Sequence, residues 1–216
     1  MTMRKDINDY SLYVFDLDGT LYDQPRLRMI MAKRLLAYYI CHPFSARDLI
    51  LLSHFRKVKD RWEGSSSEEG IIKKTAEDMN TSADRVLRIV RKWIYDAPLS
   101  ALTKTRDEKL IGWMAKLREA GRKVVVWSDY PTSDKLKALG VIADAEYSPA
   151  DTRISALKPS PEGLNIIMKD MDIACEDVLM IGDRREKDGE AAAACNVDCI
   201  ILKRKVSKRG DYGIEA

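Results

Sequence analysis

One stretch near the start of the chain constrains the fold more than any other. Residues 13–22 read Tyr-Val-Phe-Asp-Leu-Asp-Gly-Thr-Leu-Tyr, so a short apolar run ends in two acids, Asp16 and Asp18, that only Leu17 separates. The run predicts a buried strand over residues 11–18, and the glycine that follows breaks it. Ligands of open α/β sheets gather at the carboxyl ends of strands. We therefore expect both acids at the mouth of a site.

Two carboxylates in that position suit a particular kind of chemistry. One can bind a hard cation and attack an electrophile, while the other moves a proton. Because neighbouring carboxylates repel each other, such a pair needs a cation, and Mg²⁺ prefers oxygen ligands. The alternative is a plain turn that merely uses Asp and Gly. The two acids alone favour neither interpretation.

The second half of the chain alternates between strand and helix patterns. Residues 123–127 and 178–181 are apolar runs that end at Ser128-Asp129 and at Gly182-Asp183. Short strands are also expected over residues 143–147 and 197–202, with helices over residues 105–120, 131–140, 161–169 and 186–195. This alternation predicts an α/β fold, Rossmann-like, with a mostly parallel sheet and helices on both faces. The polar residues after the strands should then converge at one edge of the sheet.

Residues 24–98 interrupt this alternation with a run of helices. Pro25, Ser45 and Ser82 suit helix starts, and Gly64-Ser65-Ser66-Ser67 reads as a loop. Between Asp23 and Ser100 there are 15 Lys and Arg against 10 Asp and Glu. This excess would favour an anionic ligand, although any single basic residue more often lies on a solvated helix face.

Four motifs in order resemble those of the haloacid dehalogenase (HAD) superfamily. Asp16-Leu17-Asp18-Gly19-Thr20-Leu21 resembles the first motif, and Ser128, Lys158-Pro159 and Gly182-Asp183 through Asp188 resemble the other three. The resemblance points to the C1-capped phosphatase branch, which includes phosphoglycolate phosphatase and β-phosphoglucomutase. It implies an α/β core of residues 1–22 and 99–216 with an inserted all-helical cap of residues 23–98.

The resemblance also implies a role for each motif residue. Asp16 would be the nucleophile that forms an aspartyl-phosphate, and Asp18 would move protons as general acid and base. Ser128 would donate a hydrogen bond to a phosphate oxygen, while Lys158 would offset the negative charge. Backbone N–H groups near Leu17, Asp18 and Asp129 would add further donors to the phosphate. Mg²⁺ would be held by Asp16, the Asp18 backbone carbonyl, Asp183 and, through the metal shell, Asp188.

The implied function is a Mg²⁺-dependent phosphatase that hydrolyses a small phosphorylated metabolite. The acid at position 18 favours phosphoester chemistry, because the dehalogenase branch lacks an acid there. Two alternatives stay open: a phosphomutase similar to β-phosphoglucomutase, and a non-catalytic binding protein on the same scaffold. Segments 22–28 and 62–67 are the expected substrate-reading loops. Relatives often carry glycine near Cys195-Asn196, and we expect Asn196 to adopt the same left-handed turn.

Bulk properties set the remaining expectations. A net charge of +3 does not indicate a nucleic-acid partner, and the basic tail Lys203-Arg204-Lys205 with Lys208 and Arg209 reads as a solvated end. The four cysteines lack a Cys-x-x-Cys pair, which favours reduced thiols in a cytoplasmic protein. No segment predicts a signal peptide or a membrane span. We expect a monomer or homodimer whose substrate the sequence does not specify.

Overall fold

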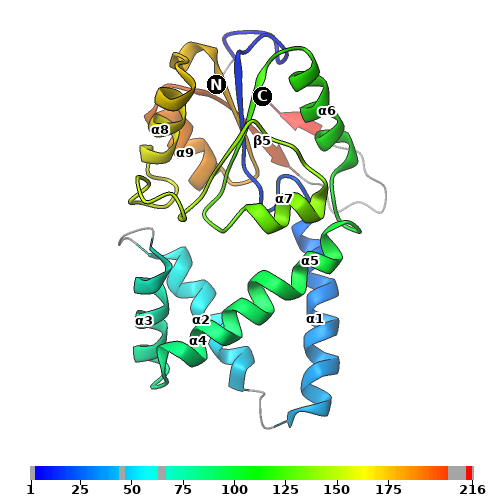
Figure 1. Ribbon diagram of the computed structural model, residues 1–216, viewed down its shortest axis with the longest axis vertical. Coiled ribbons are helices and arrows are strands. Elements are labelled where there is room, and N and C mark those ends of the chain that lie inside the picture. Colours follow the sequence, from blue (N-terminus) through cyan, green and yellow to red (C-terminus); the bar gives the residue numbers. More distant parts are fainter. Residues whose placement is uncertain (1–2, 44–46, 63–66, 204–212, 216) are drawn as a thin grey trace.

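The computed structural model describes residues 3–43, 47–62, 67–203 and 213–215. A twisted sheet with flanking helices occupies one end of the molecule, and a group of helices occupies the other (Figure 1). The predicted helix cap at Ser45 and the loop residues 63–66 lie outside the described residues, as does the basic tail from Arg204 to Arg209. Among the described helices, none is both long and apolar enough to cross a membrane.

Five parallel strands and one antiparallel edge strand form the sheet, which confirms the predicted α/β fold class. The parallel strands are β1 (Leu12–Phe15), β2 (Lys123–Trp127), β3 (Ala145–Tyr147), β4 (Val178–Gly182) and β5 (Asp198–Lys203). The strand order is β3-β2-β1-β4-β5-β6, in which β6 (Gly213–Glu215) pairs antiparallel with β5 at the edge. The central strand β1 pairs with both β2 and β4, so that Phe15 lies opposite Val126 and Ile181.

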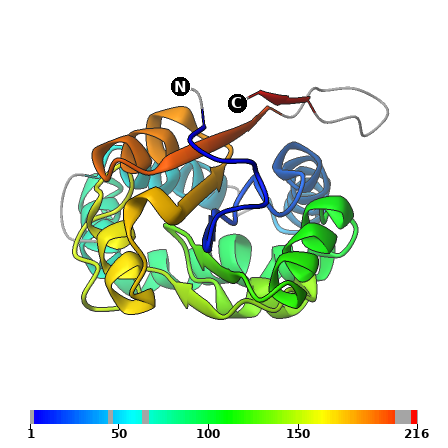
Figure 2. The same ribbon diagram turned by 90° about the horizontal axis from the view of Figure 1, so that it is seen from above.

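Alternate residues of each strand point to opposite faces of the sheet, and both faces are covered (Figure 2). Tyr13 and Phe15 belong to the cluster that includes side chains of α6 (Glu108–Glu119) and α7 (Ser133–Leu139). Leu12 and Val14 belong to the other cluster, with α8 (Glu162–Met171) and α9 (Glu190–Ala194). All four β1 residues are fully buried. Burial on both faces explains why these strands are continuous apolar runs.

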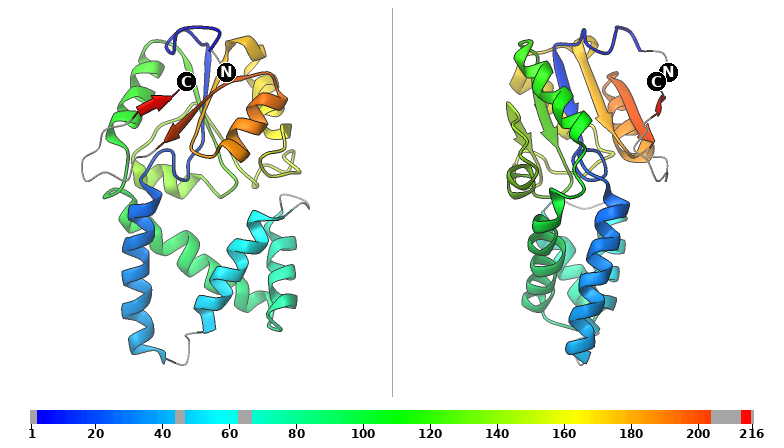
Figure 3. Two further views of the ribbon diagram at one scale, coloured as in Figure 1. Left: turned by 180° about the vertical axis from the view of Figure 1, so that it is seen from behind. Right: turned by 90° about the vertical axis from the view of Figure 1, so that its right-hand side faces the viewer.

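The helices between β1 and α6 form what we call the helical lobe, residues 24–102. It contains α1 (Gln24–Cys41), α2 (Arg47–Asp60), α3 (Glu68–Asp78), α4 (Ala83–Val90), the π-helical segment η2 (Arg91–Asp96) and α5 (Ala97–Leu102). The lobe lies beyond the carboxyl ends of the parallel strands (Figure 3). The two segments that join it to the sheet run side by side, because Tyr22 bridges to Arg106 and the Asp23 N–H donates to the Thr105 carbonyl over 2.7 Å.

Several local predictions are confirmed and two are refined. Ser82 caps α4 by accepting from the Arg85 N–H, and Asn196 has a left-handed φ of 59°. The helix expected from residue 105 begins only at Glu108, because the Asp107 side chain caps it. The helix expected over residues 186–195 is divided into a π turn, η4 (Arg185–Gly189), and α9.

Candidate active site

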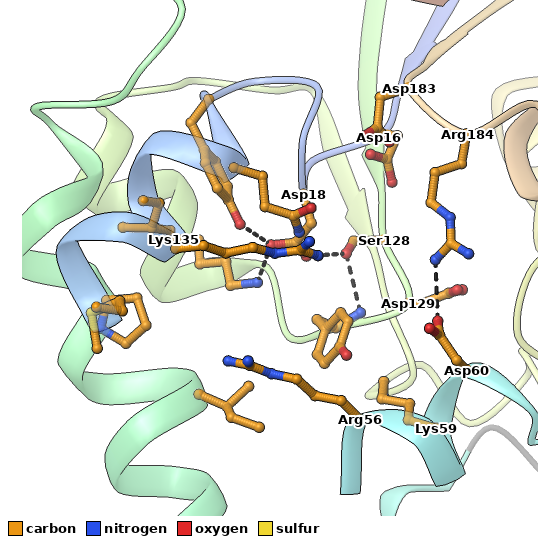
Figure 4. Close-up of a pocket in the computed structure, with 18 of the residues that line it drawn as sticks. Asp16, Asp18, Arg56, Lys59, Asp60, Ser128, Asp129, Lys135, Asp183 and Arg184 are labelled. Atoms are coloured by element: carbon orange, nitrogen blue, oxygen red, sulfur yellow. Dashed lines mark hydrogen bonds and ion pairs between the residues drawn. The ribbon is translucent and has the colours of Figure 1, made fainter. Parts of the chain in front are cut away.

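Polar side chains follow three neighbouring strands at the edge that faces the helical lobe. Asp16 comes directly after β1, Ser128 directly after β2 and Asp183 directly after β4. Figure 4 shows all three side chains at one cavity. The first strand ends at Phe15, so the segment from Asp16 to Asp18 leaves the sheet as a loop and does not extend the strand to residue 18 as expected. The convergence predicted from the apolar runs is thus present.

Three of the predicted acids form a tight cluster. Carboxylate oxygens of Asp16, Asp183 and Asp188 lie within 4.8 Å of one another. Two glycines make room for them: a Cβ on Gly19, whose φ is 97°, would lie 2.1 Å from an Asp183 oxygen, and one on Gly182 would lie 2.3 Å from the Asp188 carboxyl. Oxygen donors gathered so closely fit a hard divalent cation such as Mg²⁺.

Lys158 reaches into this cluster from the loop before α8. Its Nζ donates to Asp16 Oδ1 and Asp188 Oδ1, each over 2.8 Å, and to the Trp127 carbonyl over 2.9 Å. Burial opposes its charge, but the Asp16 and Asp188 carboxylates raise the pKa of Lys158 above the ordinary value. Burial also raises the pKa of Asp16 to about 8, an effect that Lys158 partly offsets and Asp188 and Asp183 reinforce. One lysine therefore leaves the three acids incompletely neutralised, and the cluster fits an added cation.

Asp18 lies outside this cluster and has cationic and hydroxyl partners of its own. Lys135 Nζ donates to Asp18 Oδ1 over 2.5 Å, and the Tyr22 hydroxyl donates to the same oxygen. Ser128 Oγ donates to the other oxygen over 3.2 Å. Although burial opposes ionisation, Lys135 and these hydrogen bonds hold the pKa of Asp18 below its usual range. The Asp18 carboxylate is thus ionised and fixed in direction, separate from the acids that suit a metal.

Lys135 is the residue of the site that sequence reasoning missed. It is buried in the first turn of α7, seven residues after Ser128. A cation at a helix N-terminus is electrostatically unfavourable, so a lysine there needs a carboxylate partner nearby. That placement was the available signal, although the sequence did not identify Asp18 as the partner.

Asp129, which follows Ser128 of the second motif, forms hydrogen bonds with residues of the third and fourth motifs. Its Oδ1 accepts from the Lys158 backbone N–H over 3.0 Å, and its Oδ2 accepts from Lys187 Nζ over 2.9 Å. The backbone groups assigned to phosphate binding, those of Leu17 and Asp129, belong to the loops after β1 and β2. The same two loops carry Asp16 and Ser128, so these donors and the nucleophile candidate are held by one rigid edge.

A cavity of about 690 Å³ lies between these loops and the helical lobe. The predicted segment 22–28 contributes Tyr22, Gln24, Leu27 and Arg28 to its lining. Of the predicted segment 62–67, the two described residues, Trp62 and Ser67, do not line the cavity, and residues 63–66 lie outside the described residues. The lining from that part of the lobe instead comes from the end of α2: Arg56, Lys59 and Asp60.

Two contacts hold the end of α2 against the core. Asp60 accepts from Arg184 over 3.2 Å, and the Lys59 ammonium lies 4.2 Å from the centre of the Tyr130 ring. Figure 4 shows the Asp60–Arg184 pair at the side of the cavity that lies away from Lys135. The lobe therefore covers the acids and supplies one wall of the cavity.

The sequence matches a family model described as haloacid dehalogenase-like hydrolase over residues 10–196. Among curated proteins none matches. Similar solved structures include a 2-haloacid dehalogenase from Pseudomonas syringae pv. Tomato, with a TM-score of 0.60, 14% identity and 93% and 91% of the two chains covered. The putative HAD hydrolase YfnB from Bacillus subtilis, solved with magnesium, has a TM-score of 0.61 and 13% identity, with 88% and 87% covered.

A third similar structure is a predicted phosphoglycolate phosphatase from Haemophilus somnus, with a TM-score of 0.57, 17% identity and 90% and 85% of the two chains covered. At these identities the structural similarities show the fold alone. The match over residues 10–196 carries the family, since it spans most of the 216 residues.

Proposed function

This chain belongs to the haloacid dehalogenase-like hydrolases, and we propose that within them it is a Mg²⁺-dependent phosphatase of small phosphorylated metabolites. The observation that carries the proposal is Asp18, a second, separately held carboxylate beside Asp16. A phosphoester leaves as an alkoxide that needs a proton, whereas a halide does not. We further propose that residues 23–98 act as the cap and that residues 1–22 and 99–216 form the core. The proposal needs no partner other than the substrate.

In the proposed mechanism Asp16 attacks phosphorus, and the bond between phosphorus and the leaving oxygen breaks. The ionised Asp18 accepts the proton of a monoanionic phosphoester and delivers it to that oxygen. Water then attacks the phosphorus of the aspartyl-phosphate while Asp18 takes a proton from the water, the bond between phosphorus and the Asp16 oxygen breaks, and inorganic phosphate leaves with the Asp16 carboxylate restored. Lys135 keeps Asp18 in one orientation throughout.

The other residues of the site bind and neutralise the phosphoryl group. Lys158 stays charged beside Asp16, and Ser128 Oγ turns from Asp18 to a phosphoryl oxygen. Asp16, Asp183, Asp188 and the Asp18 backbone carbonyl would hold Mg²⁺. When bound, Mg²⁺ supplies positive charge to Asp16 and the phosphoryl oxygens.

Metal removal tests the proposal directly. The chain should release inorganic phosphate from phenyl phosphate or from one of a panel of phosphorylated metabolites in the presence of Mg²⁺, and EDTA should stop the release. Excess Mg²⁺ added after EDTA should restore it. Phosphate release that EDTA leaves intact would contradict the metal role. Chloride release from 2-chloropropionate with no phosphatase activity would identify a dehalogenase, and transfer to a sugar hydroxyl would identify a phosphomutase.

The role of Asp18 predicts a dependence on the leaving group. Asp18→Asn removes the proton carrier, so it should lower kcat by about 10²- to 10⁴-fold for an alkyl phosphate. The loss should be much smaller for 4-nitrophenyl phosphate, whose leaving group departs without a proton. The measurement is kcat for both esters in parent and variant, with the midpoint of thermal unfolding as the check on folding. Equal losses for the two esters would show that Asp18 has no proton-transfer role.

A further inference from the structure

The cavity between the site and the helical lobe contains three cations that have no acidic partner. Four of its cations are paired with acids that also line it: Lys135 with Asp18, Lys158 with Asp16 and Asp188, Arg184 with Asp60, and Lys187 with Asp129. The three others are Arg28, Arg56 and Lys59. Within the described part of the chain, no carboxylate oxygen lies within 4.0 Å of their nitrogens.

Arg28 of α1 and Arg56 of α2 are close enough to influence each other. Although Arg56 is an exposed residue, the desolvation of its guanidinium by the cavity wall lowers its pKa, as does the neighbouring Arg28, while the Tyr130 side chain opposes them. Both residues are exposed, so water screens their mutual repulsion, and an anion that enters the cavity between them would be attracted by both guanidinium groups. Figure 4 shows the Arg56 side chain extending into the cavity, on the lobe side of Asp18 and Lys135.

Lys59, one turn after Arg56 on α2, is the most deeply buried of these three cations. Lys59 is only 4% exposed, and its ammonium lies over the face of the Tyr130 ring. Burial lowers the pKa of Lys59, although Glu68 and Asp129 act at longer range to raise it. No carboxylate contacts this buried ammonium directly, and a ligand anion at the cavity wall would compensate part of its desolvation.

Beyond these cations the cavity wall becomes apolar. Leu35 lies two turns after Arg28 on α1, about 10 Å farther from the sheet. From the other side η2 and α5 contribute Ile94, Pro98 and Leu102. Leu35 and Ile94 are half-buried, so their side chains remain accessible to a ligand. An apolar surface that follows a cationic one suits a molecule with a charged group on an apolar body.

We propose that the substrate is a phosphate monoester whose leaving group carries a second anion on an apolar body, with that anion bound by Arg28, Arg56 and Lys59 and the body packed against Leu35 and Ile94. This inference rests on the proposed phosphatase function and narrows its substrate class. Plain sugar phosphates leave both the cations and the apolar wall without partners, so they are poor substrates. The carboxylate or second phosphate of the substrate also keeps the two arginines together, which joins α1 to α2 over the site.

Matched aryl phosphates test the anion subsite. The pair is phenyl phosphate and 3-carboxyphenyl phosphate, assayed with parent, Arg56→Gln and the control Lys57→Gln, whose exposed side chain lies on α2 outside the cavity lining. Arg56→Gln should lower kcat/KM for the carboxylated ester about 10- to 100-fold more than for phenyl phosphate, the range expected for one charge-assisted hydrogen bond. Lys57→Gln should leave both values within about twofold. Each comparison uses one ester, so the intrinsic reactivity of the leaving group cancels.

The apolar wall is tested with Ile94→Ser and with phosphoglycolate, which has the carboxylate but no apolar body. The variant should raise KM for 3-carboxyphenyl phosphate more than for phosphoglycolate. Equal effects of Arg56→Gln on the two aryl esters would refute the anion subsite while the phosphatase function stands. If Ile94→Ser changes KM equally for 3-carboxyphenyl phosphate and for phosphoglycolate, the proposed packing of the substrate body against the apolar wall is refuted. If none of these three esters releases phosphate in the presence of Mg²⁺, the proposed function is refuted, and this inference is refuted with it.

Discussion

Replacing Asp16 with asparagine is expected to lower kcat for phosphate release by about 10⁴-fold or more, the scale of loss seen when a nucleophile is removed. The amide keeps the size of the carboxylate, and its oxygen can still accept from Thr20 Oγ1, which donates to Asp16 over 2.9 Å. It cannot attack phosphorus. Since the pKa of Asp16 is raised by burial, a neutral side chain there should cost little stability. Phosphate release and the thermal unfolding midpoint would be measured together.

Asp60→Asn is the matched control, because Asp60 lines the same cavity but lies on α2 and pairs with Arg184. It loses an exposed ion pair, for which we expect less than a tenfold change in kcat. A further check is the acyl-phosphate itself: acid-quenched parent protein should carry labelled phosphate from a labelled ester, and the Asp16→Asn protein should not. An Asp16→Asn protein that turns over at the parental rate would show that another group is the nucleophile.

The sequence predicted the edge of the sheet well because the signals there are local. Each of the three central strands, β1, β2 and β4, is mostly an apolar run that is buried on both faces, and each run ends at a polar or glycine residue. Parallel pairing then brings Asp16, Ser128 and Asp183 to one edge without any further information. Asn196 could be predicted for the same reason, since a left-handed turn after a helix requires only its own backbone preference.

The partners of Asp18 could not be predicted in the same way. Lys135 is separated from Asp18 by more than a hundred residues, and its ion pair depends on the direction of α7 after β2. Likewise, Lys59 is one of two lysines on α2, and its packing against Tyr130 distinguishes it from the exposed Lys57. Side-chain orientation on a helix of the lobe follows from how the lobe packs on the core. The residues next to a lysine in the sequence do not indicate how the lobe packs on the core, so they do not predict which lysine is buried.

Lys158→Met should have the largest effect on stability, lowering the free energy of unfolding by about 3 kcal/mol at pH 9. The side chain is 2% exposed, and its ammonium joins two carboxylates that are themselves 11% and 2% exposed. Methionine keeps most of the apolar length but leaves Asp16 and Asp188 facing each other without a cation. The measurement is urea unfolding at equilibrium. Lys109→Met is the control, because Lys109 is exposed on α6 and should change stability by less than about 0.5 kcal/mol.

The sign of the pH dependence separates an electrostatic cause from a packing defect. In the variant the carboxyl pKa of Asp16 rises further above its unfolded value, so the folded state binds a proton more tightly than the unfolded chain. The stability deficit is therefore full above the folded pKa of the variant and shrinks as the pH falls towards about 8, the pKa of Asp16 in the parent, so the variant should lie closer to the parent at pH 7 than at pH 9. Added Mg²⁺ should likewise stabilise the variant more than the parent, since the acid cluster has lost the ammonium that pairs with two of its members. A deficit that neither acid nor Mg²⁺ reduces would mean that Lys158 acts through packing against Trp127 and not through its charge.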